Sequence, residues 1–225
     1  MLSIIIPAYN EEKNLHNTLN NLEEAINSKF INHEIIIVDD CSTDNSSQII
    51  NELCKKNRNI ISIKNSKNLG FGSSFKNGLK VAKGDWIMML QGDNAWNSDN
   101  LKKLYSYYNE RDLLIQINSK MLSERGFFRW SISKVFTILL NLFRKKKIKY
   151  YNGLQIHKKE YLNKIKIEES QYCFQAEILL KTIKEYDNFK YVDMQSQSRD
   201  YGYSKAFKLK NILSTLQFLI KSQKY

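Results

Sequence analysis

Continuous apolar runs of strand length alternate with amphipathic segments through the first half of the chain. The apolar runs are LSIII at 2–6, EIIIVD at 34–39, IISI at 60–63, WIMML at 86–90 and DLLIQI at 112–117. Between them apolar residues recur at helical spacing, and we expect Asn10 to cap the first helix, with Glu11 and Glu12 in its first turn. Apolar strands separated by helices predict an α/β fold with a mostly parallel, doubly wound sheet.

The second half of the chain has a different pattern. An apolar helix is predicted over 130–143, and four consecutive cations follow it at 144–147. The apolar stripe of this helix comprises Ile132, Phe136, Leu139, Leu140 and Phe143. A helix over about 173–186, a strand over 189–194 and a last amphipathic helix complete the predicted elements. No repeat or linker interrupts the chain, so we expect one domain over 1–225.

Composition narrows the class of protein. The chain carries 35 Lys and Arg residues against 23 Asp and Glu, a net charge of +12, which favours an anionic partner such as nucleic acid, lipid headgroups or a phosphorylated small molecule. Three scattered cysteines argue for a reducing compartment and against a zinc site or disulfide framework. The chain start has no basic region, and no run reaches about 18 apolar residues, so we expect neither a signal peptide nor a spanning helix.

Acidic and polar residues follow three of the predicted strands. They occur in PAYNEE at 7–12, in the pair Asp39-Asp40 and in Gln91-Gly92-Asp93. The carboxyl ends of parallel strands share one edge of a sheet, so these groups are expected to face one crevice. Acids on a basic protein suggest a divalent cation and a phosphorylated ligand there, although each acid could instead cap the helix that follows.

Three sequence stretches resemble a known family. SIIIPAYNEEKNL, EIIIVDDCSTDNS and NLGFGSSFKNGLKVAKGDWIMMLQGDN are similar to the nucleotide-sugar-binding half of glycosyltransferase family 2, whose members have the GT-A fold. Within that family the likeness is strongest to polyprenyl-phosphate sugar synthases of the dolichyl-phosphate mannose synthase type. The resemblance implies a nucleotide-sugar-binding half over 1–120 and an acceptor-binding half with amphipathic helices over 121–225.

The resemblance also implies roles for residues at the three strand ends. Donor-binding roles fall on Pro7, Ala8, Tyr9, Glu11, Asp39, Asp40, Gln91 and Gly92. Asp93 matches the acid that binds Mg²⁺ or Mn²⁺ on the donor diphosphate and so takes part in catalysis. Gln91 stands where the family has another acid, which removes one negative charge near the cation. An amide can still hydrogen-bond a ribose hydroxyl as donor or acceptor.

Four further residues match family positions on the acceptor side. Arg129 lies in an Arg-x-x-x-Ser pattern, and Arg199 and Lys205 belong to RDYGYSK, a signature whose cations hold phosphates. Glu177, in FQAE, is the candidate base if the acceptor is a hydroxyl, and a salt bridge near a helix start is its other reading. The stretch KYYNGLQIHKK at 149–159 departs from the family, since a lysine replaces an acid and a glutamine replaces a cation.

These features predict an inverting hexosyltransferase that moves a sugar from a UDP- or GDP-sugar to a polyprenyl phosphate. One alternative acceptor is a sugar hydroxyl in cell-surface polysaccharide synthesis, and another possibility is a non-catalytic relative that only binds nucleotide sugars. The apolar helix at 130–143 and its cations favour peripheral binding to the cytoplasmic face of a membrane, against packing as an ordinary core helix. No base-reading module is recognisable, so we expect no nucleic-acid partner.

Overall fold

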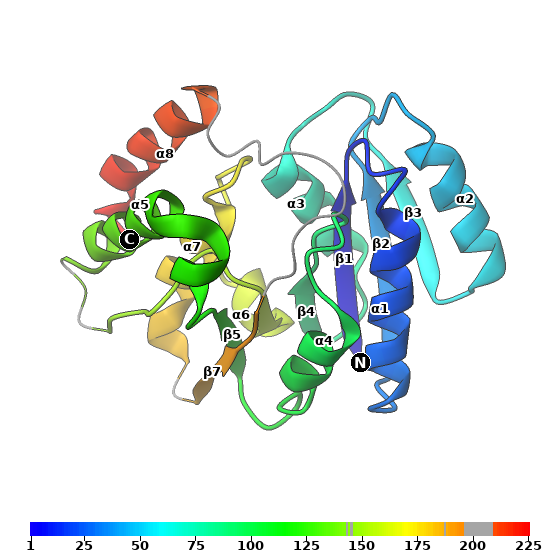
Figure 1. The fold of residues 1–225 in the computed structure, drawn as a ribbon, viewed down its shortest axis with the longest axis horizontal. Helices are drawn as coiled ribbons and strands as arrows, with labels where there is room; N and C mark the ends of the chain where they lie inside the picture. The colour runs from blue at the N-terminus through cyan, green and yellow to red at the C-terminus, as the bar shows by residue number, and fades with distance from the viewer. Residues whose placement is uncertain (143, 145, 187, 196–208) are drawn as a thin grey trace.

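A seven-stranded mixed sheet forms the centre of the molecule (Figure 1). The computed structural model describes residues 1–142, 144, 146–186, 188–195 and 209–225. The strands are β1 (Leu2–Ala8), β2 (His33–Asp39), β3 (Ile60–Lys64), β4 (Trp86–Met89), β5 (Leu113–Ile117), β6 (Gln155–Lys158) and β7 (Phe189–Asp193). Their order in the sheet is β3-β2-β1-β4-β6-β5-β7, and every neighbouring pair is parallel except the two that contain β6.

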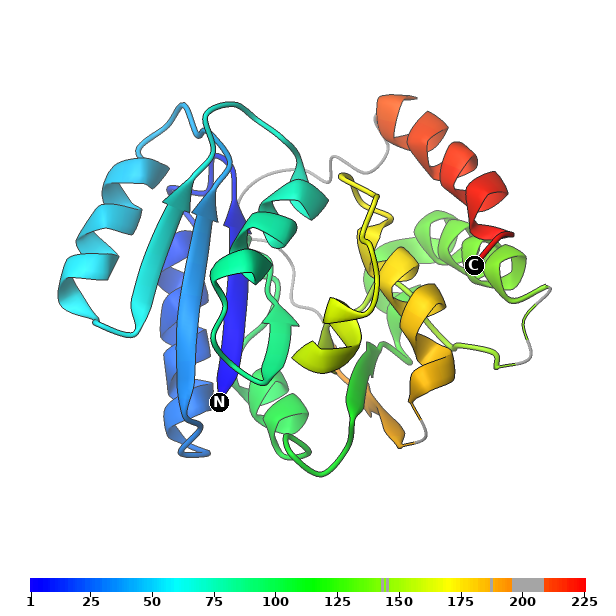
Figure 2. The same cartoon turned by 180° about the vertical axis from the view of Figure 1, so that it is seen from behind.

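Helices cover both faces of the sheet (Figures 1 and 2). One face packs against α1 (Leu15–Asn27), α2 (Ser46–Lys56) and α4 (Ser98–Tyr105). The opposite face packs against α3 (Phe71–Val81), α6 (Lys159–Asn163) and α7 (Phe174–Thr182), which continues into the 3₁₀ turn η1 (Ile183–Glu185). Strand β1 feeds both cores, because Ile4 and Ile6 join the first and Ile5 the second. The α/β fold with a mostly parallel sheet is thereby confirmed.

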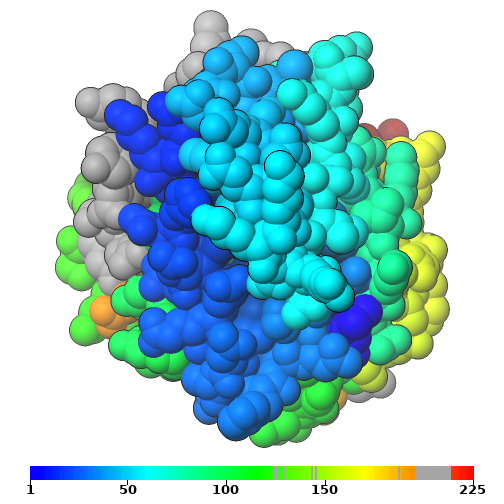
Figure 3. All heavy atoms as spheres, turned by 90° about the vertical axis from the view of Figure 1, so that its right-hand side faces the viewer, coloured from blue at the N-terminus to red at the C-terminus, as the bar shows by residue number. Residues whose placement is uncertain are grey.

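The remaining two helices form a separate layer at the β7 end of the molecule. Helices α5 (Met121–Asn141) and α8 (Leu209–Ser222) lie side by side and share a core with β5 and α7 (Figure 1). At the opposite end, β3 and α2 form the edge that faces the viewer in Figure 3. None of the helices in the described ranges has both the length and the apolarity needed to span a bilayer.

Strand β1 runs two residues further than the sequence suggests, through Pro7 to Ala8. The backbone polar groups of successive β1 residues point in turn toward β4 and toward β2. Leu90 N donates to Ile5 O at 2.9 Å on the β4 side, and Asp40 N donates to Ala8 O at 2.8 Å on the β2 side. The imide nitrogen of Pro7 therefore faces the β4 side, beyond the end of β4 at Met89. A proline is tolerated there because no ladder bond needs its missing N–H.

Helix α1 begins at Leu15, so the expectation that Asn10 caps it was wrong. Asn10 instead has a left-handed backbone (φ 58°), and the first helical turn follows Asn14. Strand β6 and helix α6 were not predicted. The polar side chains of Gln155 and His157 in β6 are buried, so the strand lacks the apolar run that marks its neighbours.

The predicted apolar stripe of 130–143 divides between core and surface. Leu140 is buried and Phe136 packs against α8, whereas the opposite side of the helix is exposed. We call this exposed set the α5 apolar face: Phe127, Phe128, Ile132, Val135, Ile138 and Leu142. Arg144 donates to backbone oxygens at the end of α8, and Lys146 Nζ donates to Tyr186 O at 2.6 Å. Two of the four cations after α5 are therefore used inside the molecule.

Candidate active site

The loops that follow β1 and β2 are joined by reciprocal hydrogen bonds. Ala8 stands opposite Asp39 in the sheet register, which aligns the two strand ends. Beyond them, Thr43 N donates to Asn10 Oδ1 at 2.8 Å, and Asn45 N donates to Glu12 Oε2 at 3.0 Å. Asn10 and Glu12, which the sequence places at the start of a helix, thus bond across the two loops. This arrangement fixes the position of Tyr9 and Glu11, which leave β1 at this edge.

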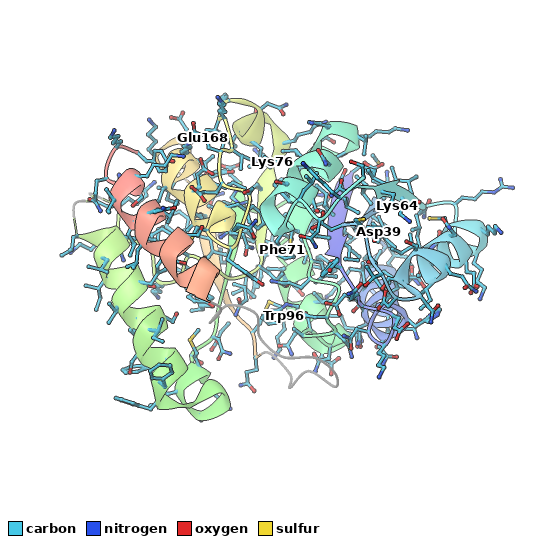
Figure 4. The ribbon with its side chains drawn as sticks, turned by 90° about the horizontal axis from the view of Figure 1, so that it is seen from above. Asp39, Lys64, Phe71, Lys76, Trp96 and Glu168 are labelled. Carbon is cyan, nitrogen blue, oxygen red and sulfur yellow. The ribbon has the colours of Figure 1, made fainter. Side chains whose placement is uncertain are left out.

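Asp39 is a buried carboxylate at the end of β2, only 3% exposed. It accepts hydrogen bonds from Ser42 N at 2.9 Å and from the Ser47 hydroxyl, and Lys64 Nζ lies 3.9 Å away (Figure 4). Burial raises the pKa of the Asp39 carboxyl, but the hydrogen bonds from Ser47 and Ser42 outweigh burial and hold that pKa below its usual value. Asp39 is therefore an anion at neutral pH.

Asp40 binds the segment that leads into α3. Its Oδ1 accepts from Asn65 Nδ2 at 2.7 Å and from Leu69 N at 2.9 Å, and its Oδ2 accepts from Gly70 N at 2.9 Å. Asn65 was missed in the sequence, although it directly follows the β3 run. It also donates to Ser74 Oγ at 3.0 Å and so connects β3, Asp40 and α3. Asp40 thus fixes the segment between β3 and α3 against the end of β2.

The end of β4 reaches the same place from the other side of β1. A Cβ atom added to Gly92 would lie 3.5 Å from Pro7 O and 3.7 Å from Glu11 Cγ, both ordinary contact distances. Gly92 therefore lies beside the end of β1 and the residues that follow it. Thr18 of α1 secures this loop, because its hydroxyl donates to Gly92 O at 3.1 Å and accepts from Asn94 N at 3.0 Å. Asp93, 8% exposed, lies between these two anchored residues.

Gln91 is bonded to a tryptophan that the sequence reading did not connect with it. Trp96 Nε1 donates to Gln91 Oε1 at 3.1 Å, and Trp96 is 6% exposed. An indole N–H can only donate, so the amide oxygen must face Trp96 and the amide NH₂ must face away from it. Within the part of the chain that the structure describes, that NH₂ group makes no hydrogen bond. Gln91 therefore offers a donor to a ligand.

The residues present fit a divalent cation that is held largely by its ligand. No group of three His, Cys, Asp or Glu side chains that could cage a metal occurs among the described residues. Mg²⁺ and similar hard cations commonly bind through one or two carboxylates, substrate phosphates and water. Asp39 and Asp40 are engaged in hydrogen bonds to the protein, and Asp93, the third buried carboxylate at this edge, suits that mode of binding better than an all-protein site.

Glu177, the sequence candidate for a base, is fully buried near the start of α7. Its carboxylate accepts hydrogen bonds from Glu168 N at 3.0 Å and Glu169 N at 2.8 Å, and it forms an ion pair with Lys181 at 2.6 Å. These contacts match the salt-bridge reading of Glu177, and they occupy both of its oxygens.

The structure does not describe the side chains of the other three acceptor-side residues. Arg199 and Lys205 lie outside the described residues, and for Arg129 the structure describes the backbone within α5 but not the side chain. The described residues thus bring together the strand-end positions of β1, β2 and β4, and leave the remaining cations as expectations from the sequence.

Comparison with known proteins agrees with this architecture. UDP-Glc:alpha-D-GlcNAc-diphosphoundecaprenol beta-1,3-glucosyltransferase WfaP of Escherichia coli is 35% identical over 128 residues, 51% of this chain and 49% of that protein. Poly(ribitol-phosphate) beta-N-acetylglucosaminyltransferase TarP of Staphylococcus aureus is 27% identical over 222 residues, 95% of this chain and 65% of that protein. The chain thus spans less than two thirds of the length of either relative.

A solved structure shares the fold. Glucosyl-3-phosphoglycerate synthase from Mycobacterium tuberculosis, crystallised with Mn²⁺, UDP-glucose and phosphoglyceric acid, superposes with a TM-score of 0.71 at 16% identity, over 99% of this chain and 78% of that one. The sequence model of glycosyl transferase family 2 matches residues 3–165, which contain all three strand ends. The chain belongs to glycosyl transferase family 2, and its sheet and helices have the GT-A arrangement.

Proposed function

We propose that the sheet edge at the ends of β1, β2 and β4 binds a nucleotide-sugar donor, with UDP as the preferred nucleotide. The observation that carries the proposal is the convergence of the buried acids Asp39, Asp40 and Asp93 on one sheet edge, where ligands of parallel α/β sheets bind. The name of WfaP specifies UDP-glucose, and the mycobacterial synthase was crystallised with UDP-glucose, which supports uridine over guanosine.

The reaction is an inverting displacement at the anomeric carbon of the donor sugar. Asp39 and the residues that leave β1 hold the nucleoside, and the Gln91 NH₂ donates to a ribose or sugar oxygen. A divalent cation, when bound at Asp93, stabilises the negative charge that develops on the departing diphosphate. The Mn²⁺ in the mycobacterial synthase supports this metal requirement.

The proposed acceptor is a polyprenyl phosphate. A lipid phosphate is already an anionic nucleophile, so its attack needs no general base. The engagement of both Glu177 oxygens in hydrogen bonds supports this choice, because the carboxylate named as base is occupied. In this proposal Arg129, Arg199 and Lys205 bind the phosphate groups of the substrates, as the family signatures suggest.

A sugar or polyol hydroxyl is the second candidate acceptor. It is favoured by the names of the relatives, since WfaP acts on a sugar carried by diphosphoundecaprenol and TarP on poly(ribitol phosphate). Glu177 would then have to act as the base, which requires that its hydrogen bonds to Glu168 N and Glu169 N open first.

The α5 apolar face supports a peripheral position on an anionic lipid surface, where a lipid-linked acceptor would be met. Phe127 is 72% exposed and Ile138 57% exposed, and Val135 and Leu142 continue the face at helical spacing. Lys134 on the same helix is exposed, and so is Lys147 after the end of the helix. An apolar helix face flanked by cations binds at the boundary between headgroups and acyl chains. The three free cysteines suit a cytoplasmic setting.

Calorimetric titration tests the donor proposal. Wild-type protein and the Asp93→Asn variant are titrated with UDP and with GDP, each with and without Mn²⁺. We expect Mn²⁺ to strengthen UDP binding to wild type and to have no effect on the variant. Binding that is indifferent to Mn²⁺ and to Asp93 would leave a nucleotide-binding protein without the proposed metal site, and absence of binding would overturn the donor site.

Transfer assays test the acceptor. Undecaprenyl phosphate and a sugar-diphosphoundecaprenol are offered separately with labelled UDP-glucose and UDP-N-acetylglucosamine, and products are identified by mass. Transfer to the monophosphate supports the leading proposal, whereas transfer only to the lipid-linked sugar replaces it with the second candidate.

A further inference from the structure

The segment 164–173, which joins α6 to α7, is held by Glu177. We call this segment the strap. The Glu177 carboxylate accepts hydrogen bonds from Glu168 N and Glu169 N of the strap and forms an ion pair with Lys181. Lys181 in turn donates to Lys166 O of the strap at 2.8 Å. A fully buried carboxylate with charge-assisted bonds holds its partners firmly, because leaving it unpaired would be costly.

The strap in turn lies directly on the start of α3. Ser170 O accepts hydrogen bonds from Gly72 N at 2.9 Å and Ser73 N at 3.3 Å, which satisfies N–H groups that the first helical turn leaves open. Lys76 Nζ of α3 also reaches Glu168 O at 3.4 Å (Figure 4). A Cβ atom added to Gly72 would lie 2.8 Å from Glu169 O, so the strap and α3 are too close at this point to admit a side chain.

The residues that lead into the start of α3 bind Asp40. Leu69 N and Gly70 N, directly before the first residue of α3, donate to the two oxygens of the Asp40 carboxylate. Gly70 has φ 91°, a conformation that favours glycine, and a carbon there would lie 2.8 Å from Ser170 O. The strap therefore packs against the same turn that grips a donor-site acid.

We propose that Glu177 is a positioning residue for the donor site. Through the strap it fixes the start of α3, and the start of α3 fixes Asp40 at the end of β2. Loosening the Glu177 carboxylate is expected to free the amides at 69–73 and to weaken nucleotide binding. This inference rests on the proposed donor function, and it gives Glu177 a role that requires no proton transfer to the acceptor.

The Glu177→Gln variant tests the proposal, with Glu185→Gln as the matched control, because Glu185 is exposed in the following turn. Hydrogen exchange of peptides that cover 65–75 is measured together with UDP affinity in the presence of Mn²⁺. We expect faster exchange at 69–73 and UDP affinity weaker by about 3- to 30-fold in Glu177→Gln only. The pH profile of kcat keeps its wild-type shape.

Other outcomes overturn the proposal. A lower melting temperature with unchanged exchange at 69–73 and unchanged UDP affinity would make Glu177 purely structural. Unchanged affinity with a large loss of kcat and of its acidic limb would make it the base. If the wild type binds no nucleotide, the proposed function fails, while the exchange measurement still decides whether Glu177 controls the start of α3.

A second variant covers the case in which Glu177→Gln does not fold. Gly72→Ala pushes the strap away from α3 without touching Glu177, and Ser73→Ala on the same turn is its control. We expect Gly72→Ala to reproduce the faster exchange at 69–70 and the weaker UDP binding. Wild-type values for both would contradict the proposed connection.

Discussion

The indole of Trp96 fixes the orientation of the Gln91 amide. The hydrogen bond between Trp96 Nε1 and Gln91 Oε1 uses the only acceptor of that amide and turns its NH₂ group away from the indole. Compared with the acid that the family resemblance implies at position 91, Gln91 therefore does more than lack a negative charge. It replaces an acceptor of hydrogen bonds with a donor.

Restoring a charge at this position should strengthen metal binding. In Gln91→Glu one carboxylate oxygen still accepts from Trp96, and the other places a negative charge near Asp93. We expect Mn²⁺ to bind the UDP complex on the order of tenfold more tightly, as a nearby opposite charge would produce. Calorimetry of Mn²⁺ in the presence of UDP measures this, with Gln223→Glu at an exposed position as control. Equal Mn²⁺ affinity in wild type and variant would place Gln91 away from the cation.

Replacement of Asp40 by asparagine should destabilise the fold. The new NH₂ group must face either Leu69 N or Gly70 N, so a partly buried donor loses its acceptor. We expect the free energy of unfolding in urea to fall by about 2–4 kcal/mol. Asp99→Asn, at an exposed position in the first turn of α4, should cost less than about 1 kcal/mol. Equal losses in the two variants would refute the role assigned to Asp40.

Mild acid should destabilise the protein through His157. Burial lowers the pKa of His157 to about 3. Gln155 Nε2 donates to Tyr151 O, so its Oε1 accepts from His157 Nε2–H, and Nδ1 accepts from the Tyr186 hydroxyl at 2.9 Å. In the folded protein the imidazole of His157 is therefore neutral, whereas in the unfolded chain the same imidazole takes up a proton below about pH 6.5.

The sign of the effect follows from that difference. Stability from His157 is fully present above about pH 6.5 and falls by about 1.4 kcal/mol per pH unit as the pH drops toward 3. Urea unfolding at a series of pH values checks this, with His157→Gln as the comparison. The variant should show a shallower slope across this range, and an identical slope would mean that His157 is protonated in the folded protein.

The α5 apolar face should bind anionic vesicles. We expect the double variant Val135→Ser/Ile138→Ser to bind phosphatidylglycerol vesicles at least about tenfold more weakly in co-sedimentation, because two exposed apolar side chains no longer enter the acyl boundary. Phe30→Ser removes an equally apolar side chain that is 95% exposed at the far turn between α1 and β2 and should change nothing. Undiminished binding by the double variant would exclude this face as the lipid contact.

The sequence predicts the parallel part of the sheet well, because β1, β2 and β4 are buried on both faces and therefore read as continuous apolar runs. It fails at β6 for the opposite reason. Gln155 and His157 bond to one another inside the protein, and His157 also bonds to Tyr186. Such a buried polar network cannot be told from surface polarity along a single chain.

The candidate site was predicted in the same uneven way. The strand-end acids could be named because chain topology alone brings them to one edge of the sheet. The contacts that hold them could not, since Asn65 and Thr18 bond residues that are distant in the sequence, and Trp96 bonds Gln91 through a local turn that the sequence pattern does not specify. The helix start at Asn10 was misread because its neighbouring acids match a capping pattern, although Glu12 bonds to Asn45 in another loop.

The position of β6 limits how the protein can be divided. This strand comes from residues 155–158, yet it lies between β4 and β5, which both precede residue 120. A fragment that ends at residue 120 would therefore expose two unpaired strand edges where β6 belongs, a template for intermolecular pairing. Expression of residues 1–120 alone should yield aggregates, and co-expression with 121–225 is the route by which the two pieces could complete one sheet.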